Sequence, residues 1–148
     1  MEKIETLSQF IQTFLPKRGN ERKNSGNEIE YVTKTLNRIF SQHFNVPLSR
    51  EEVLGVFINL GYRIFIRNAS WDAEKKTFRP SKEEESVRLG DVYSAYNCGF
   101  LYIDINASDV RMLRKASITI PPNTNLELAK QVNDLKDRIQ KFISAHMV

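Results

Sequence analysis

The chain has 148 residues, a single cysteine and a formal net charge of +4. A fold of this length buries about 68–70% of the surface that its unfolded chain exposes, which is enough for one hydrophobic core without disulfide bonds or a structural metal. The lone Cys98 excludes an internal disulfide and a cysteine-rich zinc site, and we expect it to be a buried thiol. The 22 basic and 18 acidic residues are mixed along the chain, so the charge indicates only a mild preference for acidic partners.

The segment from Met1 to Ile4 contains an acidic residue and does not lead into a continuous apolar stretch. We therefore expect no signal peptide. The longest apolar run, residues 56 to 66, is interrupted by Arg63 and is too short to span a bilayer. These features predict a cytoplasmic protein, or a component of a particle assembled in the cytoplasm, without a membrane partner.

The first part of the chain predicts a helix followed by a linker. Apolar residues recur at helical spacing over residues 3 to 15, and Pro16 ends the pattern. We treat residues 1–15 as an N-terminal amphipathic helix and a candidate docking arm. Residues 16–27 are a basic polar linker, and residues 28–148 form a single α+β domain.

Two further helices are predicted from capping signals. Asn27 with Glu30 three positions later predicts a helix that continues to about residue 43. Ser49 with Glu52 is a capping box, and Gly61 stands where a helix C-terminus favours glycine. The sequence therefore predicts a third helix between Ser49 and Gly61.

After Gly61 the apolar period changes from helical to two, which predicts a strand from about Tyr62 to Arg67. Trp71 and Phe78 flank a polar segment that suits a short hairpin, and residues 100 to 105 are the clearest strand in the chain. A short helix through residue 115 follows. The predicted class is α+β, with N-terminal helices, a small mainly antiparallel sheet and a long C-terminal amphipathic helix.

The final helix carries one apolar stripe. It opens with a predicted capping box of Thr124 and Glu127, and its apolar residues alternate at spacings of four and three from Leu128 to Phe142. The repeat is shorter than a coiled coil requires, and Ile143 widens the stripe. This favours docking within the chain, while pairing with a second chain remains open.

No catalytic or ligand-binding motif stands out in the sequence. His43 and His146 are the only histidines, and both lie at predicted helix ends, where no chemistry is needed to explain them. The chain has no glycine-rich phosphate loop, and the segment from Asp104 to Ser108 lacks the later residues of a calcium loop. We expect a protein that is not an enzyme, with no cofactor, no metal site and no small-molecule substrate.

The apolar helix stripes and the lone Trp71 favour a non-enzymatic protein–protein interaction module that binds a protein partner or forms a homo-oligomer. Such a module suits a repeated structural component of a larger multisubunit assembly, virion-like or secretion-like. Trp71 is a candidate anchor for a partner, and packing of its ring onto the sheet is the alternative. The predicted partner-binding residues are Phe10, Phe14, Trp71, Val132, Leu135, Ile139 and Phe142.

The alternative function is a small nucleic-acid-binding protein of winged-helix-like type. The helix order fits, but Glu51 and Glu52 stand at the start of the third helix, where they would face phosphates. Phosphate contact is instead predicted for the basic linker. Its candidate residues are Lys17, Arg18, Arg22 and Lys23.

Overall fold

The computed structural model describes residues 2–17, 27–43, 47–88, 91–92, 99–118 and 121–146. Within these ranges the fold is α+β, with five helices and a small antiparallel sheet of four strands, which confirms the predicted class. The helices are α1 (Glu2–Phe14), α2 (Ile29–His43), α3 (Arg50–Asn59), α5 (Ala107–Ala116) and α6 (Leu126–His146). The strands are β1 (Ile64–Asp72), β2 (Thr77–Pro80), β3 (Glu85–Ser86) and β4 (Gly99–Ile103).

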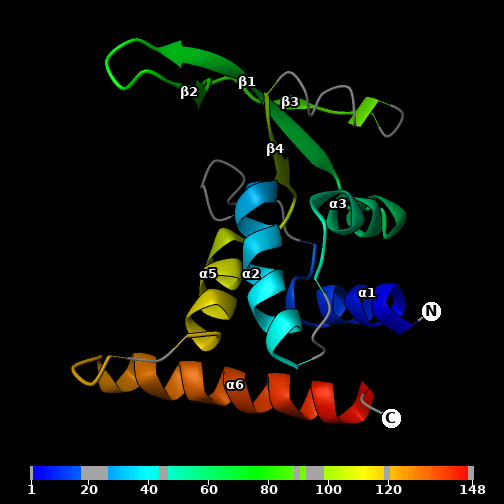
Figure 1. Cartoon of the computed structure of the whole chain (residues 1–148), viewed down its shortest axis with the longest axis vertical. Coiled ribbons are helices and arrows are strands. Elements are labelled where there is room, and N and C mark those ends of the chain that lie inside the picture. The colour runs from blue at the N-terminus through cyan, green and yellow to red at the C-terminus, as the bar shows by residue number, and fades with distance from the viewer. Residues whose placement is uncertain are drawn as a thin grey trace.

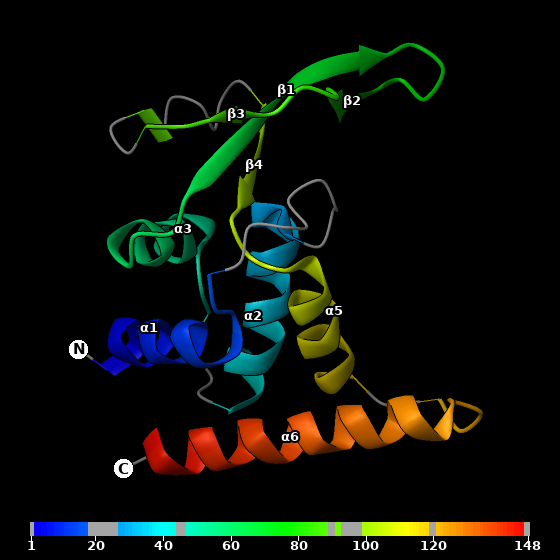
Figure 2. The same cartoon turned by 180° about the vertical axis from the view of Figure 1, so that it is seen from behind.

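The sheet lies at one end of the molecule and the helices fill the rest (Figure 1). Helices α2 and α5 run side by side below the sheet, and α6 crosses their far ends in both views (Figures 1 and 2). The β1–β2 hairpin extends outward, away from the helical part of the molecule. The start of β1 therefore adjoins α3, while its other end projects from the body.

The first helix is part of the core. Phe10 of α1 is fully buried, and its ring centroid lies 5.5 Å from that of Phe40 on α2 and 5.4 Å from that of Phe142 on α6. Phe14 lies one turn further along α1 and also meets Phe142 edge to face. In this fold, the apolar stripe of residues 3 to 15 joins three helices, so α1 does not form a separate arm.

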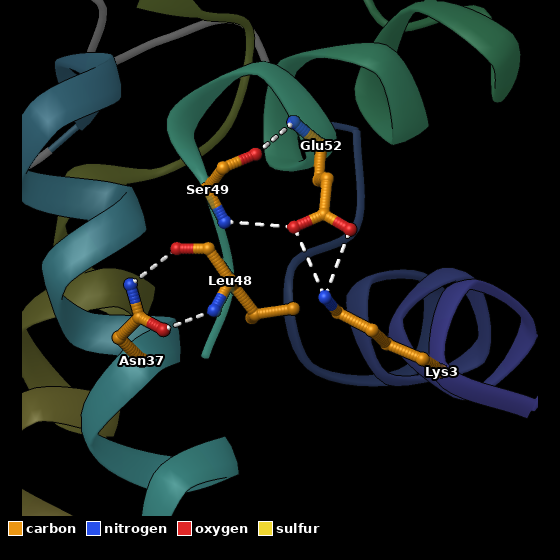
Figure 3. A network of polar contacts seen from close by, with 5 residues as sticks. All are labelled: Lys3, Asn37, Leu48, Ser49 and Glu52. Carbon is orange, nitrogen blue, oxygen red and sulfur yellow. Dashed lines mark hydrogen bonds and ion pairs between the residues drawn. The ribbon is translucent and has the colours of Figure 1, made fainter. Parts of the chain in front are cut away.

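Helix α3 is capped at both ends as the sequence predicts. The hydroxyl of Ser49 accepts a hydrogen bond from the backbone N–H of Glu52, and the Glu52 carboxylate accepts one from the backbone N–H of Ser49 (Figure 3). At the other end Gly61 has a φ of +80°, and the N–H of Tyr62 donates to the carbonyl of Phe57. The N–H of Gly61 also donates to the carbonyl of Ile58, and these two bonds form the Schellman arrangement that turns the chain from α3 into β1.

Polar contacts join α3 to its neighbours (Figure 3). The Nδ2 of Asn37 on α2 donates to the carbonyl of Leu48, and its Oδ1 accepts from the N–H of Leu48. The ammonium of Lys3 on α1 lies 2.9 Å from a carboxylate oxygen of Glu52. The Glu52 carboxylate thus caps α3 and also binds α1. The hydrogen bond from Lys3 is the main cause that lowers the pKa of Glu52, and the bond from the backbone N–H of Ser49 lowers it further.

Two predicted helix caps are wrong by one residue. The N–H of Glu30 donates to the carboxylate of Glu28, whereas the buried Asn27 donates from its Nδ2 to the carbonyl of Ile103 at the end of β4. Helix α6 is capped by Asn125, whose Oδ1 accepts from the N–H groups of residues 127 and 128. Thr124, the predicted cap, donates its hydroxyl to the carbonyl of residue 121 instead.

Strand β1 organises the sheet. Its first half pairs with β4 on one side and with β3 on the other, and its second half pairs with β2. The residue opposite Asn68 on β4 is Gly99, and a Cβ there would lie 2.4 Å from the carbonyl oxygen of Arg67. Only glycine permits this close pairing of β1 and β4.

The stripe of α6 is covered by the chain itself. Val132, Ile139 and Ile143 are buried, and Leu135 and Phe142 are partly buried against the core. The favoured interpretation, docking of this helix within the chain, is therefore confirmed.

Candidate protein-interaction surface

The β1–β2 hairpin is built by local bonds of its first strand. The Oδ1 of Asp72 accepts the N–H groups of Glu74 and Lys75 and so fixes the turn, which Lys76 completes with a φ of 51°. The other oxygen of Asp72 lies 3.1 Å from a guanidinium nitrogen of Arg79 on β2. The backbone N–H of Lys75 is the main cause that lowers the pKa of Asp72.

The register gives the hairpin two chemically different faces. Ala69 pairs with Pro80 and Trp71 with Phe78, while Ser70 pairs with Arg79 and Asp72 with Thr77. Since successive residues of a strand point to opposite faces, the first four residues share one face and the last four the other. We call the face formed by Ala69, Trp71, Phe78 and Pro80 the ribbon face.

The ribbon face is exposed. The side chains of Trp71 and Phe78 are 56% and 59% exposed, and their rings meet edge to face at 5.1 Å. Ala69 and Pro80 are exposed beside them. Among the residues that the structure describes, this is the only place where two large exposed aromatic side chains contact each other.

The ribbon face continues toward the helices into a pocket. On β4, Phe100 pairs with Arg67 and Tyr102 with Phe65, so both rings lie on the same side of the sheet as Trp71. The guanidinium of Arg67 lies 5.3 Å from the centroid of the Tyr102 ring. The pocket has a volume of about 330 Å³ and is lined by Glu28, Glu30, Tyr31, Lys34, Pro80, Phe100 and Tyr102.

The carboxylate of Glu28 gives this pocket its particular electrostatics. Burial raises the pKa of Glu28 to about 7, and the nearby charge of Glu30 adds to the effect. The N–H of Glu30 and the cations Arg50 and Lys34 act in the opposite direction. Near neutral pH the carboxyl is therefore divided between its charged and neutral forms, and a cation placed beside it would favour the charged form.

The structure separates the predicted partner-binding residues into two groups. Trp71 lies on the ribbon face, while the helix residues contribute to the core. Phe10, Phe14, Val132 and Ile139 are buried, and Leu135 and Phe142 are partly buried against the core. In this fold only Trp71 of the predicted set presents a large exposed apolar surface.

Of the basic linker, the structure describes residues 16, 17 and 27. The ammonium of Lys17 lies 5.4 Å from the centroid of the Tyr62 ring, where it makes a cation–π contact. Arg18, Arg22 and Lys23 lie outside the described residues, as does Cys98. Lys17 is exposed, and its contact orients it toward the end of α3.

Sequence reasoning did not assign Phe78, Pro80 or Phe100 to the site. The signal for Phe78 was present, because Trp71 and Phe78 stand on either side of the predicted turn at positions that can pair. Pro80 and Phe100 join the surface only through the β1 register and the pairing of β4, which no local pattern reveals.

A larger hollow, of about 530 Å³, lies between α1, α5 and α6. Its charged side chains have both signs and include Asp109, Asp134 and Arg138, whose guanidinium lies 5.2 Å from the centroid of the Phe14 ring. This mixture indicates no single class of ligand.

Comparison of the chain with protein-family models, curated proteins and solved structures yields no match. In the described ranges, no three or more His, Cys, Asp or Glu side chains are grouped so that they could hold a metal ion. None of the helices described is long and apolar enough to cross a membrane.

Proposed function

We propose that this protein is a non-enzymatic protein–protein interaction module, a structural component repeated in a larger assembly, and that the ribbon face is its contact surface. The observation that carries the proposal is the pair of exposed aromatic rings, Trp71 and Phe78, on a hairpin that projects from the body. Contiguous exposed apolar surface on an otherwise polar element commonly marks a site of association.

The chemistry of the pair suits an anchor. Aromatic side chains have few rotatable bonds, so ordering them at an interface costs little conformational entropy for the area they bury. Full burial of a large apolar side chain stabilises by about 1.5–3 kcal/mol, and each ring has roughly half of that available because its other half is already covered. Covering both rings would therefore contribute a few kcal/mol to binding.

The fold supports the hairpin as the contact element. The apolar stripes of α1 and α6 pack in the core, so a partner could reach them only if the domain opened. The hairpin, by contrast, is held by its own turn and ion pair, and it needs no rearrangement to bind.

A second candidate is contact with a single-stranded nucleic acid by the same hairpin. Lys75 and Lys76 are exposed at its turn, next to the two rings, and base stacking on aromatic side chains combined with basic residues is a common mode of such binding. Binding of this kind weakens steeply with salt, whereas apolar contact between proteins holds or strengthens.

Site-specific photo-crosslinking in the cells that produce the protein tests the proposal. A benzophenone side chain at position 71 retains an aromatic ring on the ribbon face, and the same group at Ser70 reports on the polar face of the same strand. Leu126, an exposed apolar residue on α6, is the control for non-specific crosslinking from an exposed apolar position. We expect protein adducts from position 71 only. Equal adduct yields from all three positions, or nucleic acid as the only adduct, would contradict the proposal.

A further inference from the structure

We infer that the surface formed jointly by α2 and α5 binds the phosphate backbone of double-stranded nucleic acid. This goes beyond the proposed function and uses a different part of the molecule, so either can fail without the other. We call the surface the basic face. It consists of Lys34 and Arg38 on α2 and of Arg111, Arg114 and Lys115 on α5.

Two tertiary contacts fix how the two helices border each other. Helices α2 and α5 run side by side in both views (Figures 1 and 2). The guanidinium of Arg114 lies 5.1 Å from the centroid of the Tyr31 ring, in the first turn of α2. In the last turn of α2 the side-chain amide of Gln42 donates to the carbonyl of Ser117, directly after α5. The contacts therefore define which side of each helix adjoins the other.

Helical spacing places the remaining cations beside this boundary. Lys34 and Arg38 follow Tyr31 by three and seven residues, so they lie on the same side of α2 in the next two turns. On α5, Arg111 and Lys115 are four residues apart and flank the arginine that covers Tyr31. The side chains of these four basic residues are exposed. One continuous surface over two helices thus carries five cations.

The basic face accounts for the positive net charge of the chain. Apart from its five cations, the chain has 17 basic and 18 acidic residues. None of the ion pairs between described residues includes Lys34, Arg38 or Lys115. The one acidic residue of α2, Glu30, is paired with an arginine of α3, and the one acidic residue of α5, Asp109, lines the hollow beside α1 and α6. The cations are therefore not neutralised by their own helices.

The two ends of the basic face differ. At the start of α2 it borders the pocket that contains Glu28 and Glu30, and Lys34 lines that pocket as well. At the other end Lys136 of α6 lines a small pocket together with Gln42 and residues at the end of α5. The positive surface therefore extends from Lys34 toward α6 and stops at the carboxyl groups before it.

The composition of the basic face favours phosphate groups over an acidic protein. Stable protein interfaces have a desolvated centre of aromatic or aliphatic anchors. Among the described residues, no large exposed apolar side chain lies on α2 or α5. Phosphate contacts need no such centre, because charge and the release of counterions supply the affinity. Arginine also donates through a fork that matches two phosphate oxygens.

The same surface favours a duplex over a single strand or a membrane. A single strand is commonly held by bases stacked on aromatic rings, but Arg114 already covers the Tyr31 ring. A helix that lies on a membrane inserts its apolar face, but the apolar faces of α2 and α5 are buried in the core. The backbone of a duplex can be held by charge alone, so we expect binding without sequence preference.

Fluorescence anisotropy of the full chain with a short labelled DNA duplex, over a range of salt concentrations, tests the inference. The test variant carries Lys34→Gln, Arg38→Gln and Lys115→Gln together. The logarithm of the association constant falls with the logarithm of salt concentration by about 0.9 per phosphate contact, so this variant should have a slope shallower by about three times 0.9. The control variant has the same net charge through Lys82→Gln, Lys130→Gln and Lys141→Gln, at positions that are also exposed, and its slope should stay unchanged.

Circular dichroism verifies that both variants keep the fold. Equal slopes for the two variants would show that binding follows net charge alone and would overturn the inference, as would a full chain that does not bind the duplex at low salt. Tighter binding to a single strand of the same length, or binding to phosphatidylserine vesicles in place of the duplex, would also overturn it. Crosslinking from position 71 tests the proposed function separately, so a failure of one proposal is distinguishable from a failure of the other.

Discussion

The side-chain amide of Asn37 makes two hydrogen bonds to the backbone of a single residue, Leu48, at 2.7 Å and 2.6 Å. Leu48 directly precedes the cap of α3, so α2 holds the entry of α3 through one side chain. The Lys3–Glu52 ion pair ties the same turn to α1. The position of α3, and with it the start of β1, depends on these contacts.

Asn37→Ala should destabilise the fold by about 2 kcal/mol, because each lost hydrogen bond contributes about 1 kcal/mol net. Urea unfolding followed by circular dichroism measures the loss. Arg38→Ala, at an exposed neighbouring position of α2, is the control and should change stability by about 0.5 kcal/mol or less. If both variants unfold at the same urea concentration, the two hydrogen bonds between Asn37 and Leu48 contribute nothing to the stability of the fold.

Gly61→Ala should cost about 1–2 kcal/mol, since a residue with a Cβ is strained at a φ of +80°. Gly61→Asn should cost less, because asparagine tolerates the left-handed conformation better. Thermal unfolding of the two variants gives the comparison. An alanine variant that is at least as stable as the asparagine variant would show that the Schellman turn does not set the stability here.

Phe142→Ala should destabilise the fold by about 3 kcal/mol, because it removes the ring that meets Phe10 and Phe14 and leaves a cavity between α1 and α6. Leu126→Ala, at an α6 side chain that is 87% exposed, should have almost no effect. The two unfolding free energies are measured in urea. Similar values for both variants would mean that α6 is not docked on α1.

Glu28→Gln should change how stability depends on pH. Burial raises the pKa of Glu28 from its ordinary value of 4.5 to about 7, so the folded state holds the proton more tightly and stability falls as pH rises from about 4.5 to 7. Glutamine can keep the cap bond to Glu30 and removes the titration. Allowing for partial solvent exposure, we expect the variant to gain about 2 kcal/mol at pH 8 and nothing at pH 4. A gain that does not vary with pH would refute the burial of this carboxyl.

The parts of the fold with local causes could be predicted from the sequence. Both ends of α3 follow from Ser49, Glu52 and Gly61, because these residues cap through bonds to their own helix. The two caps that were predicted wrongly have different causes: a tertiary contact in one case, and a neighbouring residue of similar chemistry in the other. Ile103 binds Asn27 and removes it from the helix end, and Asn125 offers the same chemistry as Thr124 one residue later.

The candidate interaction surface could be predicted only in part. A lone tryptophan in a polar segment indicated Trp71, but apolar periodicity indicated α1 and α6 equally well. Periodicity shows that a stripe must be covered and does not show by what. The rings of Phe10, Phe14 and Phe142 cover one another, which only the packing of α6 across α1 reveals.

Trp71 is the only tryptophan in the chain, so its fluorescence reports directly on the ribbon face. The most direct measurement is the emission spectrum and its quenching by acrylamide, at a protein concentration where sedimentation velocity shows a single chain. Exposure of the ring on the ribbon face predicts red-shifted, easily quenched emission. Blue-shifted, protected emission from the single chain would place the ring in the core and would contradict the account.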